Sequence, residues 1–247
     1  MPVWLEAGLW SLLGASSLLI GAALGYAVQF PARLTAGIMA FGCGVLISAV
    51  AYDLIMVGFQ EGGLWPIIAG ALAGSAAYTF ADWLIMKRGG RYRRRSGESQ
   101  QSQGDVGRII AIGALLDGVP ECIVLGIGLL RGSGISLAML AAIFLSNLPE
   151  ALTSAISLKR AGSGKVYIIG LWVGVAVLSS LAALIGTALL GRAAPWLVAT
   201  VNAVAAGALL TMISDTMLPE AVEQGHRGTG ALVVLGLLVA FALSHAG

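Results

Sequence analysis

The chain has 247 residues, of which 58% are hydrophobic and 11% are charged, with a formal net charge of +2. Soluble domains carry roughly a quarter charged residues, so this composition and a mean hydropathy of +0.91 exclude an ordinary soluble protein. The two cysteines, Cys43 and Cys122, both fall in apolar segments, which argues against a disulfide framework.

Eight apolar segments follow one another from one end of the chain to the other. Each has about the 20 residues that a helix needs to cross a bilayer, whereas barrel strands would alternate polar and apolar residues at about half this length. We therefore predict an all-α polytopic membrane protein. No basic residue precedes the first segment, so we interpret it as a retained helix and not as a signal peptide. The expected helices span residues 5–28, 35–58, 63–86, 108–130, 135–158, 165–190, 196–219 and 228–246.

A basic loop follows the third segment. It reads KRGGRYRRRSGESQQSQGD (87–105), and six of its first nine residues are Lys or Arg. Together with the other loops, this places twelve basic residues on one side of the membrane and only Arg131 and Arg192 on the other. The positive-inside rule then predicts a cell (plasma or inner) membrane protein with a flexible cytoplasmic loop at 87–107 and both termini outside. Binding of anionic lipids at 87–95 is a further interpretation of the same charges.

These elements divide the chain into four parts. Three helices lie in 1–86, the basic loop occupies 87–107, a hairpin of two helices lies in 108–160, and three helices lie in 161–247.

Two similar six-residue motifs lie in the two helices of the hairpin. They read DGVPEC (117–122) and SNLPEA (146–151), and each has a carboxylate directly after a proline. The first lies about 14 residues before the turn at 131–134 and the second about 15 residues after it. At a rise of about 1.5 Å per residue, both lie roughly 20 Å from the turn, so we expect them side by side in the membrane.

The spacing within each motif gathers oxygen atoms on one helix face. Asp117 and Glu121 are four residues apart, and so are Ser146 and Glu150, with Asn147 three residues from Glu150. Each proline also removes a helix hydrogen bond and loosens the carbonyl four residues before it.

Three carboxylates in a bilayer need a counter-charge. One intramembrane charge costs at least about 2.5–3.5 kcal/mol, and no Lys or Arg lies at the centre of these helices to compensate it. Protons or a cation remain, and a multivalent metal ion suits an all-oxygen cage. The competing interpretation is a proline kink whose acid is protonated and hydrogen-bonded to a neighbour.

A second, weaker repeat links GVLISAVAYDLIM (44–56) with GALLTMISDTMLPE (207–220). Each begins with Gly and has an Asp eight or nine residues later, in helices of opposite direction. This pattern predicts an inverted repeat with three helices on either side of the central hairpin (3+2+3). Asp53, Asp215 and Glu220 are then candidate ligands where an ion enters or leaves, or alternatively solvated acids at the interface.

At these residues the chain resembles the ZIP (zinc/iron permease-like) family of divalent metal transporters, whose fourth and fifth helices carry HNxPEG and His-x-x-Pro-(His or Glu) motifs. The resemblance implies metal ligation by Asp117, Glu121, Ser146, Asn147 and Glu150. It also implies a homodimer and an elevator-like motion, in which helices one, four, five and six slide against the other four. A divalent metal ion (Zn, Fe or Mn) is then the substrate, with no organic cofactor and no nucleic acid partner.

The motifs depart from the family pattern in their ligand chemistry. Asp117 and Ser146 stand where the family has His, Gly118 stands where the fourth helix usually has Asn, and the segment 165–190 has no acid. Loss of imidazoles makes the site harder, which favours Mn²⁺ or Fe²⁺ over zinc, and one metal over two.

We therefore predict a transporter of divalent cations of the zinc, iron or manganese class, and not an enzyme. Three alternatives stay open. One is a non-transporting metal sensor or regulatory homologue, and another is a proton-coupled carrier of an organic solute. The third, an intramembrane enzyme, needs a nucleophile and a base at reactive spacing, and no such constellation stands out.

Overall fold

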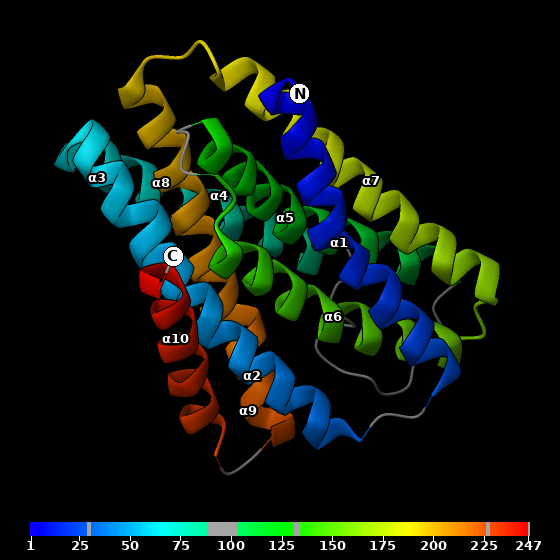
Figure 1. Ribbon diagram of the computed structural model, residues 1–247. Helices are drawn as coiled ribbons and strands as arrows, with labels where there is room; N and C mark the ends of the chain where they lie inside the picture. The colour runs from blue at the N-terminus through cyan, green and yellow to red at the C-terminus, as the bar shows by residue number, and fades with distance from the viewer. Residues whose placement is uncertain (29–30, 88–102, 131–133, 226–227, 247) are drawn as a thin grey trace.

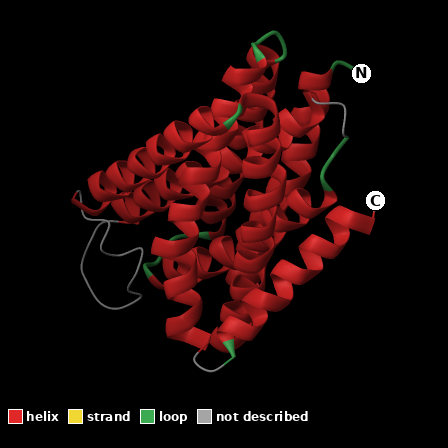
Figure 2. Ribbon diagram, turned by 90° about the vertical axis from the view of Figure 1, so that its left-hand side faces the viewer, coloured by secondary structure: helices red, strands yellow, loops and turns green. Residues whose placement is uncertain are grey.

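The computed structural model describes residues 1–28, 31–87, 103–130, 134–225 and 228–246, and within these ranges every regular element is helical (Figure 2). Two short π-helical segments, η1 and η3, interrupt the second and seventh membrane spans. The elements are α1 (Val3–Ala27), α2 (Ala32–Ala49), η1 (Val50–Met56), α3 (Val57–Gly62), α4 (Leu64–Lys87), α5 (Gln103–Leu130), α6 (Leu137–Arg160), α7 (Lys165–Leu190), α8 (Pro195–Met212), η3 (Ile213–Met217), α9 (Leu218–Gly225) and α10 (Thr229–Ala246).

The helices match the predicted membrane spans. Seven described stretches are long and apolar enough to cross a membrane, and α10 contains a shorter apolar helix. The all-α polytopic fold is thus confirmed. Helix α5 begins at Gln103 and not at residue 108, because its first turn is polar and therefore invisible to a hydropathy pattern. The basic segment 88–102 and the lipid interpretation of 87–95 lie almost wholly outside the described residues.

The helices form two groups. In the first group, α1, α5, α6 and α7 pack on one another around their own apolar core, which includes Leu18, Leu158 and Trp172. In the second group, α4 packs on α8 and α2 packs on α10 (Figure 1). The main contact between the groups is α2 against α6, with a smaller one between α5 and α8.

Glycines bring α2 and α10 into close contact. A Cβ atom at Gly44 would overlap the carbonyl oxygen of Val233, and a Cβ atom at Gly236 would overlap the carbonyl oxygen of Phe41. Each glycine therefore packs against the residue that lies three positions before the glycine of the opposing helix. Small residues allow such close approach of membrane helices, where van der Waals packing drives association.

The pair α8 and α4 repeats this arrangement. A Cβ atom at Gly207 would overlap the carbonyl oxygen of Ala71, and one at Gly74 would overlap the carbonyl oxygen of Val204. The offset of three residues is the same on both helices as in the pair formed by α2 and α10. The two helix pairs, each of which joins a helix from the first half of the chain to one from the second half, thus pack by the same rule.

The π-helical segments follow the same symmetry. η1 begins at Val50, six residues after Gly44, and η3 begins at Ile213, six residues after Gly207. Each contains the aspartate of the predicted repeat, Asp53 or Asp215. π-helical turns inside α-helices are frequent at functional sites. The inverted 3+2+3 repeat is confirmed, and its two π segments are a feature that the sequence pattern did not predict.

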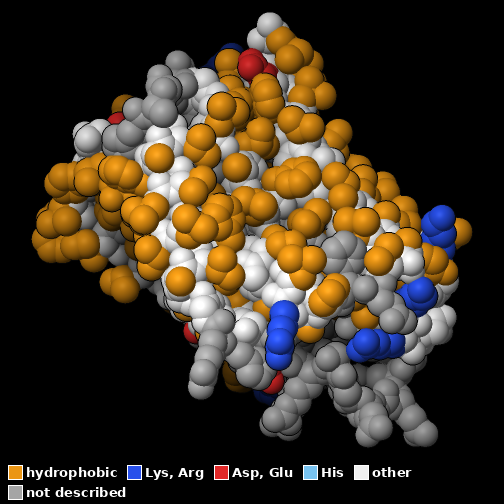
Figure 3. Space-filling view, turned by 60° about the horizontal axis from the view of Figure 1, so that its bottom comes forward, with side chains coloured by type: hydrophobic (Ala, Val, Ile, Leu, Met, Phe, Trp, Pro, Cys, Tyr) orange, Lys and Arg blue, Asp and Glu red, His pale blue; other side chains and the backbone are white. Residues whose placement is uncertain are grey.

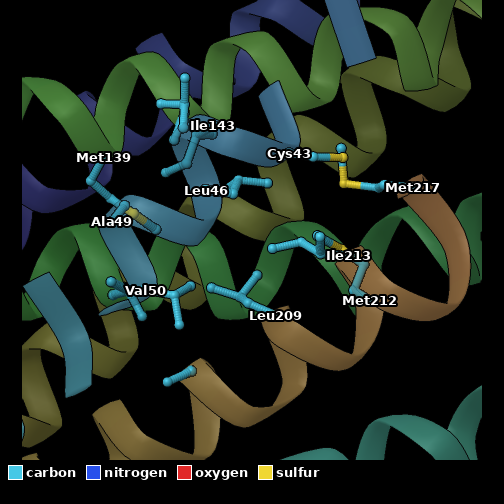
Figure 4. Packing of buried hydrophobic residues seen from close by; sticks show 14 of the residues in the cluster. Cys43, Leu46, Ala49, Val50, Met139, Ile143, Leu209, Met212, Ile213 and Met217 are labelled. Atoms are coloured by element: carbon cyan, nitrogen blue, oxygen red, sulfur yellow. The ribbon is translucent and has the colours of Figure 1, made fainter. Parts of the chain in front are cut away.

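Apolar side chains fill the contact between the two groups and cover the outside. Figure 4 shows Leu46 of α2, Ile143 of α6 and Leu209 of α8 in one buried cluster. On the face in Figure 3, hydrophobic side chains dominate and Lys and Arg gather toward one edge. This distribution suits a multi-pass membrane protein, with lipid-facing helices and charges at the ends of the spans.

Candidate metal-binding site

Helix α5 carries the first motif on its buried side. Asp117 is 4% exposed and Glu121 is 1% exposed. Both lie in one continuous helix, which runs through Pro120, so they share a face one turn apart as predicted. Two acids this well buried are rare in proteins unless they are paired or bind a cation.

Helix α6 carries the second motif and continues through Pro149. Ser146 and Asn147 are buried, and Glu150 is half-buried. The carbonyl oxygen of Leu145, which the proline deprives of its helix partner, lies 3.2 Å from the position that a Cβ atom on Gly42 of α2 would take. The second motif thus lies at the contact between the two helix groups.

The two motifs face each other. Ser146 Oγ lies 3.3 Å from Glu121 Oε1 and 3.0 Å from the carbonyl oxygen of Ile143, so its hydroxyl can donate to either acceptor. Glu150 and Asp117 lie near enough to Glu121 that the three carboxylates would repel one another if they were ionised. The structure therefore brings Asp117, Glu121 and Ser146 together in a buried region, with the half-buried Glu150 nearby.

One carboxylate oxygen in this neighbourhood has no hydrogen-bond partner in the described part of the chain. It is Glu121 Oε2, which is fully buried. A buried acceptor left unpaired costs about 1–3 kcal/mol, and more if it is charged. A bound cation would satisfy this oxygen, so the chemistry of the donor set fits a metal ion.

The acids alone do not form a complete metal cage in this arrangement. Across the described ranges, no three His, Cys, Asp or Glu side chains are close enough together to hold one ion. An ion would therefore need the Asn147 amide and the Ser146 hydroxyl, or a small closure that brings Glu150 inward. The predicted ligand set of Asp117, Glu121, Ser146, Asn147 and Glu150 stays a prediction.

A tyrosine that the sequence analysis missed contacts the site. Tyr78 of α4 donates a hydrogen bond from Oη to Asp117 Oδ1 at 2.9 Å, and its side chain is 2% exposed. The available signal was a tyrosine in the middle of an apolar helix, since a buried phenol hydroxyl usually finds a partner. Its partner could not be named from sequence spacing.

The presence of a glycine at position 118 has a steric explanation. A Cβ atom there would lie 3.0 Å from Ser179 Oγ of α7, and that hydroxyl is buried without a partner among the described residues. Helix α7 thus approaches α5 too closely for an Asn at 118 without rearrangement. Helix α7 presents this hydroxyl to α5 and has no acid between Lys165 and Leu190.

The outer candidate ligands lie elsewhere in the fold. Asp53 in η1 accepts a hydrogen bond from Ser136, which precedes α6, at 2.7 Å. Asp215 in η3 is exposed, and Glu220 in α9 is half-buried. None of them belongs to a described cluster of metal-binding side chains, and their role as ligands stays a prediction.

A family model described as ZIP zinc transporter matches residues 86–244, which is more than half of the chain and includes both motif helices. The chain belongs to the ZIP family. No curated protein matches the chain. Membership of ZIP makes it a divalent metal transporter of a non-enzymatic family and a multi-pass membrane protein, as the motifs predicted. The inverted repeat extends the same architecture to the helices that precede the matched range.

Proposed function

We propose that this ZIP protein carries one divalent cation at a time through a site between α5 and α6. Asp117, Glu121, Asn147 and Glu150 would be its ligands, and Ser146 would assist directly or through a water. The contact between Ser146 and Glu121 is the observation that carries this proposal, because it joins the two motifs at the buried Glu121 carboxylate.

Charge balance favours a dication at this point. Three acids that repel one another in an apolar interior can be neutralised by protons or by a metal ion. A dication removes most of the repulsion in one step and satisfies the unpaired Glu121 Oε2. When the ion leaves the site, the repulsion between the acids returns, and their unbalanced negative charge attracts the next ion.

The oxygen-only donor set favours a hard ion. With Asp117 and Ser146 in place of imidazoles, the proposed ligands supply oxygen atoms, so the site resembles Mn²⁺ or Fe²⁺ sites more than zinc sites. We therefore propose Mn²⁺ or Fe²⁺ as the preferred substrate, although the family takes its name from zinc.

The packing of the helices supports an elevator-like transport step. Each group has tight glycine contacts inside it: Gly21 and Gly25 of α1 abut the backbone of α6, as Gly44 and Gly207 do in the other group. At the contact between the groups, a Cβ atom on Gly42 would lie 3.2 Å from the carbonyl oxygen of Leu145, which is close but leaves more room than the glycine contacts inside each group. Two helix groups that pack more tightly within themselves than against each other can slide past each other, and the site then moves with α5 and α6.

We further propose inward transport across the cell membrane, with both termini outside and the 87–107 loop in the cytoplasm. The exposed Arg33, Lys87, Lys159, Arg160 and Lys165 lie at helix ends that share one side of the bundle. A homodimer and anionic lipid at 87–95 belong to the same proposal, on the family resemblance and on charge alone.

Flux measurements on purified protein in liposomes test this function. A metal-sensitive dye inside the liposomes reports uptake of Mn²⁺, Fe²⁺ and Zn²⁺ by wild type, Glu121→Gln and Glu150→Gln. We expect wild type to transport Mn²⁺ and Fe²⁺ and both variants to lose most of that flux. Glu223→Gln, at an exposed acid of α9, is the matched control. Metal binding without flux by wild type would favour a sensor, and full flux by both variants would contradict the site.

A further inference from the structure

The hydrogen bond between Tyr78 and Asp117 joins the two helix groups. Its donor lies on α4 in the second group, and its acceptor lies on α5 in the first group, with 2.9 Å between Tyr78 Oη and Asp117 Oδ1. Both side chains are buried. A hydrogen bond from a hydroxyl to a carboxylate is stronger than a neutral one, and it restricts the acceptor to one orientation.

Each partner is held firmly in its own group. Tyr78 follows Gly74 by one helical turn, and Gly74 abuts the backbone of α8 at Val204. Asp117 precedes Gly118, which abuts α7 at Ser179. Tyr78 therefore moves with α8, and Asp117 moves with α7, whenever the groups change their relative position.

We infer that Tyr78 is a positioning residue for Asp117, and that it makes metal affinity depend on the relative position of the two groups. The inference rests on the proposed function, in which Asp117 is a ligand. In the present arrangement, Tyr78 holds the Asp117 carboxylate in one orientation. When the first group slides, Asp117 leaves Tyr78 behind and loses this restraint. The ion is bound strongly in one arrangement and weakly in the other, which favours its release.

The loss of metal affinity expected from removing the Tyr78 hydroxyl can be estimated from metal sites in general. Groups that hydrogen-bond to a ligating side chain fix its orientation, and their loss typically lowers metal affinity by about 10- to 100-fold. A purely structural role for Tyr78 would lie in its ring, which packs in the cluster around Leu46 and Leu209. Substitution by Phe keeps that ring and removes only the hydroxyl, so the two roles can be separated.

Binding of Mn²⁺ to the purified full-length protein tests the inference. We expect Tyr78→Phe to weaken Mn²⁺ binding by about 10- to 100-fold, and to raise KM for flux more than it lowers kcat. Tyr167→Phe, at an exposed tyrosine on α7, is the control and should bind as wild type. In an Asp117→Ala background, Tyr78→Phe should cause no further loss, because the acceptor of its hydrogen bond is gone.

The outcomes separate this inference from the proposed function. If Asp117→Asn and Glu121→Gln weaken binding and Tyr78→Phe does not, the inference is wrong and the site stands. An equal loss from Tyr78→Phe with and without Asp117 would also overturn the inference, since the hydroxyl would then act elsewhere. If Asp117→Asn binds Mn²⁺ as wild type does, both the inference and this part of the site are wrong. Unchanged thermal unfolding of Tyr78→Phe confirms that the fold is intact.

Discussion

Ser136 donates a hydrogen bond to Asp53, with 2.7 Å between Ser136 Oγ and Asp53 Oδ2. Ser136 also caps α6 by accepting a hydrogen bond from the backbone N–H of Met139. Asp53 belongs to η1 in the second helix group, and α6 belongs to the first. The groups are therefore linked by a carboxylate at this end of the bundle, as they are by Tyr78 and Asp117 deeper in it.

Asp53 is expected to attract cations before they reach the buried site. It is half-buried beside the start of α6, on the side that the proposed topology places outside the cell. Removing its charge by Asp53→Asn should raise KM for metal flux about 5-fold, equivalent to about 1 kcal/mol, and leave kcat nearly unchanged. Initial rates over a range of Mn²⁺ concentrations measure this effect.

Two further variants test whether the effect of Asp53→Asn on KM comes from the charge of Asp53 itself. Ser136→Ala keeps the charge of Asp53 and should change KM less than Asp53→Asn does. Glu61→Gln removes an exposed acid from the end of α3 and should behave as wild type. An Asp53→Asn variant with wild-type KM would show that this acid has no part in ion capture.

The glycine contacts of the inverted repeat predict a stability effect. Gly44→Ala and Gly207→Ala should each destabilise the protein by about 1–3 kcal/mol, because the new methyl group overlaps the backbone of the adjacent helix. Thermal unfolding of the purified protein measures the loss. Similar losses from both variants are expected, since the two sites are related by the pseudo-symmetry.

Helix α7 offers a matched control for this prediction. At Gly170 and Gly174, nothing lies within 4 Å of an added Cβ atom. Gly170→Ala should therefore leave stability unchanged or raise it slightly, because Ala is the better helix former. If Gly44→Ala unfolds at the same temperature as Gly170→Ala, the close contact between α2 and α10 is not present in the membrane protein.

Restoring imidazoles should change the preferred ion. The double variant Asp117→His/Ser146→His supplies two nitrogen ligands at the places where the family has them, and nitrogen ligands favour Zn²⁺ over Mn²⁺. The ratio of Zn²⁺ to Mn²⁺ flux, measured in competition, should rise by about 10-fold or more, which corresponds to about 1.4 kcal/mol. An unchanged ratio would mean that these two side chains do not touch the ion.

Much of this fold could be predicted from local patterns. Most helix bounds, the contact between the motifs of α5 and α6, and the inverted repeat follow from hydropathy, motif spacing and the matching Gly–Asp segments. The π-helical turns could not be predicted, because the residues of η1 and η3 include no proline and differ little in composition from the adjacent α-helices.

Part of the candidate site could likewise be predicted from the sequence, and part of it could not. The four-residue spacing of Asp117 and Glu121 predicted a shared face, and antiparallel neighbours at equal depth predicted the contact with Ser146. Tyr78 is 39 residues from Asp117 in the chain, and no local pattern relates the two. Whether the five predicted ligands converge on one ion depends on small movements of side chains, which spacing does not determine.

Anomalous scattering from crystals of the protein soaked with Mn²⁺ would show directly whether an ion binds between the two motifs. We predict a single strong peak between α5 and α6, within coordination distance of Glu121 and at least two of Asp117, Asn147 and Glu150. A peak away from Glu121, or no peak from protein that binds Mn²⁺ in solution, would contradict this prediction.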